Sequence, residues 1–569
     1  MKRSLMTLAA GAMALAAAGL SGGAAAADKD QAADLILQNG KILTPGGYAE
    51  AMAVRNGVLV AIGSSGDVAD WRKPRTKVVD LKGGTVLPGF HDMHVHPLMG
   101  GQKQFQCIFE QGSTPDEIKA AVAACVKGRK KGEWIVGGQY QSISFGDNPP
   151  NRQFLDAVTP DNPVMLGDIS GHSIWVNSKA IEVAGVTRDT PDPEGGVIER
   201  DGNGEPTGLF HETAGELIRR HVPAYTPAQN VKAMQSAVDE MLAQGITSFT
   251  DAAVWDSTIL EAYATLAQQG KLKQRVRGCL VWGATVGMPT ADDVIAVRNR
   301  YRSARFDPDC IKIFMDGVPT DSHTAAMLDD YMPVEGREGR SKGILMVEQE
   351  KLNAAVTAFD AQGFTVKFHA AGDGAVRSAL DAIEAARKAN GMGGRRHSVG
   401  HITFAHPDDL KRARDLGATL EYSPYLWFPS EINEDIKKAA GAERMERAWP
   451  VAEGLATGAL VVVGSDWSVV PSVSPWIALE TLVTRRVPGG DSELYAPSQA
   501  ITLDQAVKIF TENAAREMGH RHMVGVLEEG MVADFIVLDR NPFEVEPTTI
   551  HDTQVRMTFI DGEMVYSAR

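Results

Sequence analysis

Signals of several common protein classes are missing from this 569-residue chain. Its four cysteines include no C-x-x-C pair, which argues against a structural zinc knuckle. The glycine-rich turns at 316–317 and 372–374 lack the spacing of a phosphate-binding P-loop. After the N-terminal leader, no apolar run is long enough to cross a membrane as a helix. These absences argue against a zinc-knuckle protein, a P-loop nucleotide enzyme and an integral membrane protein.

Positive charge is also scarce. The chain has 57 Lys and Arg against 72 Asp and Glu, so its formal net charge is −15. Such an acidic surface repels phosphate backbones and anionic lipid headgroups. We therefore expect neither nucleic acid nor an anionic membrane as a partner, whereas a small-molecule substrate is compatible with this charge.

Residues 1–27 have the features of a secretory signal peptide. Two basic residues precede an Ala-rich apolar stretch, and Ala25-Ala26-Ala27 resembles an A-x-A cleavage site. We expect the mature chain to be periplasmic or secreted, with no membrane anchor after cleavage. Export permits disulfides, so Cys107 and Cys125 either pair with each other or remain buried thiols.

Both ends of the mature chain are expected to be rich in strands. Short apolar runs alternate with the hairpin signals Asn39-Gly40 and Asn56-Gly57, and the C-terminal residues have the same pattern. We predict that residues 28–85 and 526–569 together form one small β-sandwich domain.

Residues 86–525 alternate short apolar strands with longer helical patterns, which is typical of parallel α/β proteins. Eight strands of this kind predict a closed (β/α)8 TIM barrel. An insertion at 172–228, with a hairpin tip at 201–204, is expected after the second strand, as a decoration or as a flap over the barrel mouth. The expected strands are 85–90, 164–166, 246–249, 311–314, 365–368, 397–399, 418–421 and 460–463.

Six side chains that can bind a metal ion occur at the ends of these strands, where this fold places its chemistry. Two of them are separated by one residue, so they point to the same face of a strand. Each has an ordinary structural explanation alone, but six together predict a metal-dependent catalytic site. They are His94, His96, Lys312, His369, His401 and Asp466.

Seven stretches of the chain follow one another in a distinctive order. They are PGFHDMHVH (88–96), GHSIWVNS (171–178), PTG (206–208), KIFMDG (312–317), FHAAGD (368–373), GSDW (464–467) and GMVADFIVLD (530–539). In this order they resemble the amidohydrolase superfamily. More narrowly, they resemble its amidohydrolase 3 group, also called YtcJ-like or N-substituted formamide deformylase-like. The likeness extends over nearly all of the mature chain.

The resemblance implies a centre with two divalent metal ions. His94, His96 and Asp466 would hold the more buried ion, and His369 and His401 would hold the second. Zinc is the default because neutral imidazole and carboxylate ligands suit it. A hydroxide shared by the ions would attack a carbonyl carbon, with Asp466 as general base and then general acid.

Lys312 would bridge the two ions after carboxylation of its amine by CO₂. An ammonium repels a cation, whereas a carbamate offers two anionic oxygens; a buried lysine is neutral often enough to react. One position departs from the family pattern, because relatives often carry Glu before the histidine of strand six and this chain has Gly400. His397 and His406 lie nearby and are rivals of His401 as the ligand.

Four residues are candidates for substrate contact. His172 would donate a hydrogen bond to a developing oxyanion, or else serve a structural role. Trp175, Tyr425 and Trp427 would line an apolar pocket, or else pack in the core.

The sequence therefore predicts an exported metal-dependent amidohydrolase that cleaves the C–N bond of an amide, N-acyl or formamide substrate. A lactonase or phosphotriesterase-like enzyme could use the same ligands. A catalytically silent regulatory or binding protein on this fold is the alternative from another class, although an intact ligand set argues against it. A homodimer is the common outcome in the resembled family.

Overall fold

The structure is a computed structural model of the chain. It describes residues 32–568 except 111, 147–148, 169–172, 194–195, 284–289, 321, 334–340, 427–429 and 491. The expected signal peptide lies outside these residues. Within them, no helix combines the length and the apolar character that a membrane span requires.

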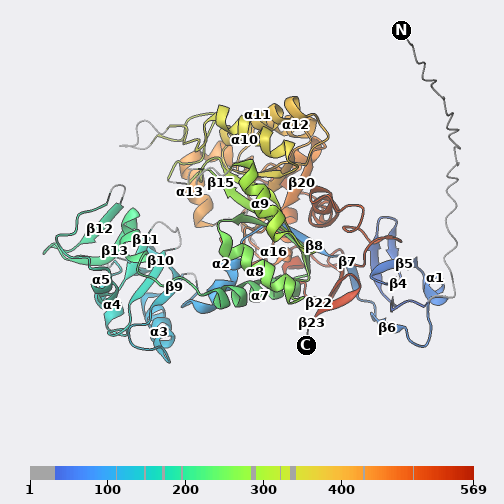
Figure 1. Cartoon of the computed structure of the whole chain (residues 1–569), viewed down its shortest axis with the longest axis horizontal. Coiled ribbons are helices and arrows are strands. Elements are labelled where there is room, and N and C mark those ends of the chain that lie inside the picture. The colour runs from blue at the N-terminus through green and yellow to red at the C-terminus, as the bar shows by residue number, and fades with distance from the viewer. Residues whose placement is uncertain are drawn as a thin grey trace, which may run out of the picture.

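Eight parallel strands form the central sheet, in the order β20-β19-β18-β17-β16-β15-β14-β8. Helices that follow individual strands surround this sheet (Figure 1). The strands are β8 (Phe90–Val95), β14 (Ile246–Val254), β15 (Arg275–Trp282), β16 (Phe306–Phe314), β17 (Thr365–Ala370), β18 (Ser398–His401), β19 (Thr419–Tyr422) and β20 (Leu460–Val463). The surrounding helices include α7 (Pro227–Ala243), α8 (Ser257–Gln268), α9 (Ala291–Tyr301), α10 (Gln349–Ala361), α11 (Asp373–Asn390), α12 (Pro407–Asp415), α15 (Val451–Ala456) and α16 (Pro475–Thr484).

The ends of the sheet meet through β8 and the loop that follows β20. The Asp466 amide donates to the His94 carbonyl (2.7 Å), and the His96 amide donates to the Trp467 carbonyl (2.5 Å). Gly464 permits this approach, because a Cβ there would lie 2.2 Å from the His94 Cβ. The closed (β/α)8 topology predicted from the sequence is therefore confirmed.

Local sequence explains how the helices begin and which face they bury. Thr226 caps α7 by accepting a hydrogen bond from the Gln229 amide, and the Gln229 side chain returns to Thr226. Pro227 occupies the first turn, where its missing N–H costs nothing. Apolar residues from Ala233 to Met241 recur at helical spacing and pack against the barrel.

The expected barrel strand at 164–166 is wrong. β10 (Val164–Asp168) instead belongs to a separate five-stranded sheet, and β15 takes a place in the barrel that sequence reasoning missed. Arg275 and Arg277 interrupt the apolar pattern of β15, yet both are buried with carboxylate partners. The first barrel strand is also later than expected, since β7 (Thr85–Pro88) pairs outside the barrel and β8 begins after Gly89.

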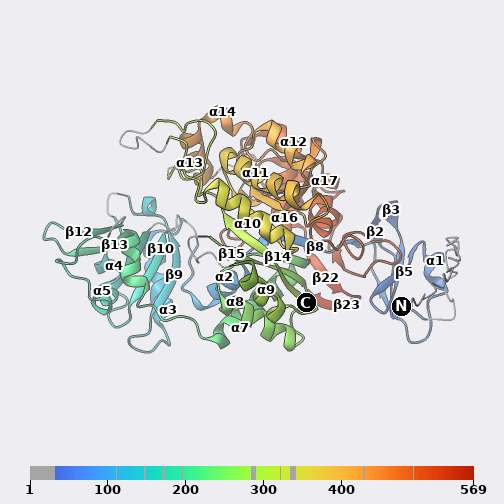
Figure 2. The ribbon, with the colours of Figure 1, turned by 45° about the horizontal axis from the view of Figure 1, so that its top comes forward.

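The separate sheet is inserted between the first two barrel strands, not after the second. Its order is β12-β13-β11-β10-β9, and it projects from one side of the barrel in both views (Figures 1 and 2). Its strands are β9 (Ile135–Tyr140), β10, β11 (Ser173–Val176), β12 (Gly196–Arg200) and β13 (Pro206–Glu212). The expected hairpin at 201–204 joins β12 and β13, which pair antiparallel.

The two ends of the chain meet on the opposite side of the barrel. β7 pairs with β21 (Phe535–Leu538), so residues far apart in sequence share one six-stranded sheet, β23-β22-β21-β7-β2-β3. A second sheet, β5-β4-β1-β6, contributes Leu37 and Val54 to a core that also holds Val86 and Phe559. The remaining strands are β1 (Leu35–Gln38), β2 (Lys41–Thr44), β3 (Gly47–Ala49), β4 (Ala51–Arg55), β5 (Val58–Gly63), β6 (Lys77–Asp80), β22 (Val555–Ile560) and β23 (Glu563–Ser567).

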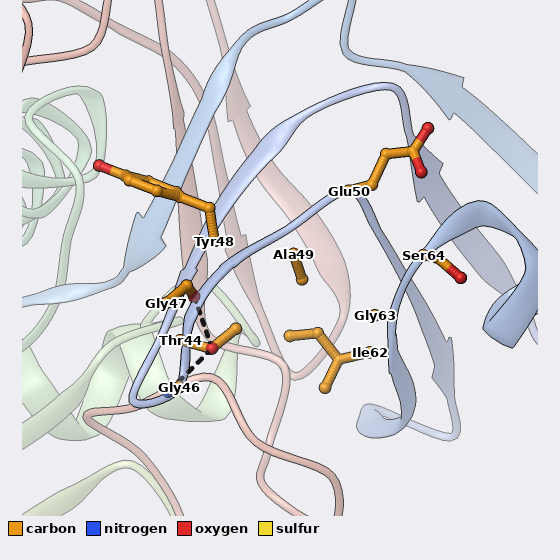
Figure 3. A pocket seen from close by; sticks show the side chains of 9 residues that line it. All are labelled: Thr44, Gly46, Gly47, Tyr48, Ala49, Glu50, Ile62, Gly63 and Ser64. Carbon is orange, nitrogen blue, oxygen red and sulfur yellow. Dashed lines mark hydrogen bonds between the residues drawn. The ribbon is translucent and has the colours of Figure 1, made fainter.

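A hollow of about 370 Å³ opens in this terminal region (Figure 3). Backbone of the β2–β3 turn, Tyr48, Glu50 and Ile62 line it. None of the six predicted metal ligands lies there, so it is separate from the predicted site.

All four cysteines form disulfides. Cys107 pairs with Cys125, which the sequence left open. Cys279 pairs with Cys310, which the sequence did not indicate. The second disulfide joins register partners on β15 and β16, so it links neighbouring strands of the barrel.

Arg275 connects the barrel to the terminal sheets, because its guanidinium donates to Asp534 and Asp561. Burial raises the pKa of Asp534, and the Arg275 charge opposes that rise. We expect Arg275→Met to lower the free energy of unfolding by about 3–5 kcal/mol, since it leaves a buried carboxylate without its partner. Urea denaturation measures this loss. Arg305→Met, which removes a more exposed partner of Asp561, should cost about 1 kcal/mol or less; equal losses in both variants would contradict the prediction.

Candidate metal centre

The six predicted ligands converge at the carboxyl ends of the barrel strands. His94 and His96 come from the end of β8, Lys312 from β16, and His369 from β17. The other two, His401 and Asp466, end β18 and follow β20. This is the rim at which barrels of this fold carry their chemistry.

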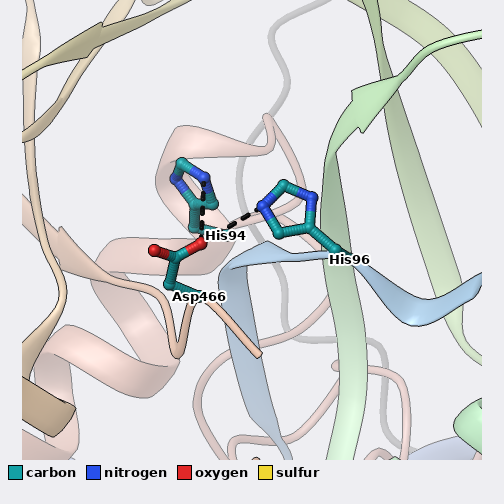
Figure 4. A group of neighbouring side chains, drawn as sticks. All are labelled: His94, His96 and Asp466. Carbon is teal, nitrogen blue, oxygen red and sulfur yellow. Dashed lines mark hydrogen bonds and ion pairs between the residues drawn. The ribbon is translucent and has the colours of Figure 1, made fainter. Parts of the chain in front are cut away.

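His94, His96 and Asp466 form the tightest part of the cluster. Their potential ligand atoms all lie within 4.8 Å of one another. The Asp466 carboxylate lies between the two imidazoles, with Oδ1 at 3.2 Å from His96 Nε2 and 3.7 Å from His94 Nε2 (Figure 4). These three residues could hold one metal ion.

The Asp92 side chain anchors the backbone of this group. Its Oδ1 accepts hydrogen bonds from the amides of His94 (3.1 Å) and Ser465 (3.0 Å). One buried carboxylate thereby ties the two chain segments that carry His94 and Asp466. Burial raises the pKa of Asp92 to about 6, although these hydrogen bonds oppose the rise.

Lys312 lies beside this group in the barrel interior. Its side chain is buried, and its Nζ is 3.4 Å from His94 Nε2. Burial, followed by the nearby Lys367 ammonium, lowers the pKa of Lys312 to about 7. A substantial fraction of this amine is therefore neutral near neutral pH.

The two remaining histidines complete the cluster. The His401 ring centroid lies 4.6 Å from that of His94 and 4.6 Å from that of His369. His369 Nε2–H donates to the Gly317 carbonyl (3.0 Å), which leaves the Nδ1 lone pair available. His401 Nδ1 lies 3.8 Å from Asp466 Oδ2.

Burial keeps these imidazoles neutral. It is the largest influence that lowers the pKa values of His94 and His401 well below the usual range and the pKa of His369 to about 4. Burial alone would raise the pKa of Asp466, but its hydrogen bond with His96 and the nearby His401 hold that pKa below its usual value. Neutral imidazoles beside an ionised carboxylate are the donor set that a divalent transition metal prefers.

The two rival histidines lie outside this cluster. His397 is buried, with Nδ1 accepting from the Val366 amide and Nε2 at 3.0 Å from Asp360. His406 caps α12 at the surface. The geometry therefore favours His401 over both.

The candidate substrate residues have different positions. Trp175 is fully buried in the core of the inserted sheet, and its indole N–H donates to the Asn151 carbonyl. Trp175 therefore packs in the core of the inserted sheet, because β11, the strand that carries it, does not belong to the barrel. Tyr425 is buried in the barrel core and donates to the Val473 carbonyl (3.4 Å). His172 and Trp427 lie outside the described residues.

Sequence reasoning gave no role to several residues that contact the ligands. Glu421 on β19 lies 2.6 Å from His94 Nδ1. Phe314 on β16 lies beside His369, and its ring stacks on Trp255, the residue after β14. A charged residue ending the apolar strand 418–421 was a signal for Glu421, whereas the aromatic pair depends on contacts across strands.

Comparison with known proteins agrees with this fold. Residues 77–566 match the Amidohydrolase family. Protein LONG AFTER FAR-RED 3 of Arabidopsis thaliana is 30% identical over 549 residues, which cover 94% of this chain and 92% of that protein. The N-substituted formamide deformylase of Arthrobacter pascens is 27% identical over 551 residues, 94% of this chain and 99% of the enzyme.

A solved structure has the same architecture. The crystal structure of an uncharacterized metal-dependent hydrolase from Pyrococcus horikoshii superposes with a TM-score of 0.73 at 23% identity, covering 90% of this chain and 99% of that one. The chain belongs to the amidohydrolase family, as its motifs predicted. The prediction of a metal-dependent amidohydrolase is confirmed at the level of the family.

Acidification of the metal-free protein tests the neutral state of the cluster. The pKa of His369 is about 4 in the fold and about 6.5 when unfolded. Between these values the unfolded chain binds more protons, so stability should fall as the pH is lowered from about 6.5 to about 4. His369→Gln should remove about 1.4 kcal/mol per pH unit from this slope, as measured by urea denaturation. His406→Gln, at an exposed cap, should keep the parent slope; an unchanged slope in His369→Gln would refute the interpretation.

Proposed function

We propose that this protein hydrolyses the C–N bond of a small amide-type substrate, an amide, N-acyl compound or formamide. The observation that carries the proposal is the convergence of His94, His96 and Asp466, with Lys312 beside them, at the carboxyl rim of the barrel. The N-substituted formamide deformylase named above supports the choice of bond. A metal-loaded protein tested on amides, formamides, lactones and organophosphates, with release of amine measured, distinguishes this reaction from the alternatives on the same site.

Two divalent ions, with zinc as the default, fit the donor set. His94, His96 and Asp466 would hold the first, and His369 and His401 the second. Bound there, such ions would acidify a water molecule and polarise the carbonyl group of the substrate.

Lys312 would connect the two positions as a carbamate. Its neutral amine nitrogen would form a bond to the carbon of CO₂ and lose a proton, which gives a carbamate whose single negative charge is shared by two oxygens. A pKa of about 7, caused by burial, supports this reaction because it leaves the lone pair free near neutral pH.

Asp466 would move the proton that hydrolysis requires. Its low pKa keeps the carboxylate ionised, so it can accept a proton from the attacking water. The same carboxyl can then donate this proton to the departing nitrogen, which cannot leave as an amide anion.

We also propose that the protein works outside the cytoplasm. The signal-like leader motivates this proposal, and the Cys107–Cys125 and Cys279–Cys310 disulfides support it, because such bonds persist in oxidising compartments.

Asp466→Asn should retain much of the bound metal and lose turnover by a factor of about 10²–10⁴. The amide oxygen can still act as a ligand, but the side chain no longer accepts a proton. Metal analysis together with kcat for amine release measures both effects. Asp360→Asn, which changes another buried Asp–His pair away from the cluster, should keep its activity. Full activity of Asp466→Asn would end the assignment of the general base.

Two stacked aromatic side chains, Trp255 and Phe314, form an aromatic wall between the surface and the cluster. They suggest which substituent the substrate carries. Trp255 is 42% exposed and stacks on Phe314, with ring centroids 5.3 Å apart. Phe314 in turn lies 5.6 Å from the His369 ring and 5.0 Å from Lys312 Nζ. An apolar or aryl group attached to the scissile amide could pack here while the carbonyl faces the ligands.

Trp255→Ala should lower kcat/KM for an aryl amide by about 3- to 10-fold, because a stacking partner is lost. The value for unsubstituted formamide should change little, since that substrate has no group to reach the wall. Steady-state kinetics on both substrates measures the difference. Tyr48→Ala, which removes an exposed aromatic ring in the hollow of Figure 3, serves as the control; equal losses on both substrates would argue against the subsite.

A further inference from the structure

Glu421 contacts the candidate metal centre through the His94 ring. Its side chain is fully buried on β19. Oε1 lies 2.6 Å from His94 Nδ1, on the side of the ring that faces away from Lys312 and Asp466. The carboxylate therefore contacts the one nitrogen of His94 that the cluster does not use.

Two further side chains fix the other oxygen of Glu421. Lys367 on β17 forms an ion pair with Oε2, and the Ser398 hydroxyl on β18 donates to it at 3.2 Å. The Lys367 charge compensates the carboxylate in a part of the barrel that excludes water. Glu421 is thereby held as a hydrogen-bond acceptor, so His94 Nδ1 must carry the proton and Nε2 must present its lone pair.

Gly400 provides the space that this arrangement needs. A Cβ at position 400 would lie 2.7 Å from Glu421 Oε1. Any side chain there would displace the carboxylate from His94. The glycine that departs from the family pattern and the buried glutamate on the next strand thus belong to one arrangement.

We propose that Glu421, held by Lys367 and Ser398, is a positioning residue that sets the tautomer and orientation of His94 for metal binding. The proposal rests on the metal site proposed above and adds a residue that acts through His94. Carboxylates that receive the second N–H of a ligating histidine typically contribute a factor of 10–100 to metal affinity.

The test is the zinc affinity of the purified protein, measured by competition with a chromophoric chelator and without any substrate. Glu421→Gln keeps the shape but removes the charge, and we expect it to weaken zinc binding by about 10- to 100-fold. Glu480→Gln is the matched control, because Glu480 is equally buried and lies 2.7 Å from His551 Nδ1, outside the cluster. The control should lose thermal stability to a similar degree while binding zinc as the parent does. Equal zinc affinities of Glu421→Gln and the parent would overturn the proposal.

Gly400→Ala gives a second test that leaves every charge in place. It should weaken zinc binding because the added methyl displaces Glu421, and in the Glu421→Gln background it should add little further loss. Fully additive losses would show that position 400 acts independently of Glu421 and would also overturn the proposal. Zinc affinity is measured without substrate. A protein that binds zinc as expected but cleaves no amide would therefore refute the proposed reaction and leave the role of Glu421 intact.

Discussion

The contact between β8 and the loop after β20 is the constraint on which the candidate site depends. The His94 carbonyl accepts the Asp466 amide at 2.7 Å, so the backbone that closes the barrel also fixes the distance between two ligands. Gly464 is required at the junction because a Cβ would collide with His94. Asp92 strengthens the junction by accepting amides from both segments. Closure of the barrel therefore brings His94 and Asp466 together.

Two buried lysines of the barrel, Lys367 and Lys312, have different neighbouring side chains and therefore suit different roles. Lys367 forms an ion pair with the buried Glu421 carboxylate. Among the described residues, no carboxylate lies within ion-pair distance of Lys312, and burial lowers its pKa to about 7. The difference follows from position, because Lys312 ends in the ligand cluster whereas Lys367 lies two residues before His369. One lysine is suited to structure, and the other is suited to reaction with an electrophile.

Sequence patterns predicted the parts of the fold that follow local rules. Seven of the expected strands lie in or directly before barrel strands. Polar residues at the ends of those expected strands correctly placed His94, His369 and Asp466 at the rim of the barrel. β15 was missed because Arg275 and Arg277 break its apolar pattern, and only their distant carboxylate partners make burial possible. The insertion was assigned to the wrong strand pair for a different reason, because β10 has the local apolar pattern of a barrel strand although it belongs to the separate sheet.

Local sequence patterns do not predict contacts between side chains on different strands. Glu421 meets His94 across the interior of the closed barrel, and no periodicity links positions 327 residues apart. The same is true of Trp255 and Phe314, whose stacking depends on the register of three neighbouring strands.

The neutral cluster has an energetic consequence for the whole fold. The His401 ring centroid lies 4.6 Å from those of His94 and His369, so the three imidazoles are desolvated together, and protonation of one disfavours protonation of the others by charge repulsion. Folding thus concentrates lone pairs that water no longer satisfies. A cation bound to those lone pairs would interact more strongly with the folded state, in which they converge, than with the unfolded chain, so it would stabilise the fold by mass action. The arrangement that would hold a metal at the rim would therefore also make the barrel more stable once a metal is bound.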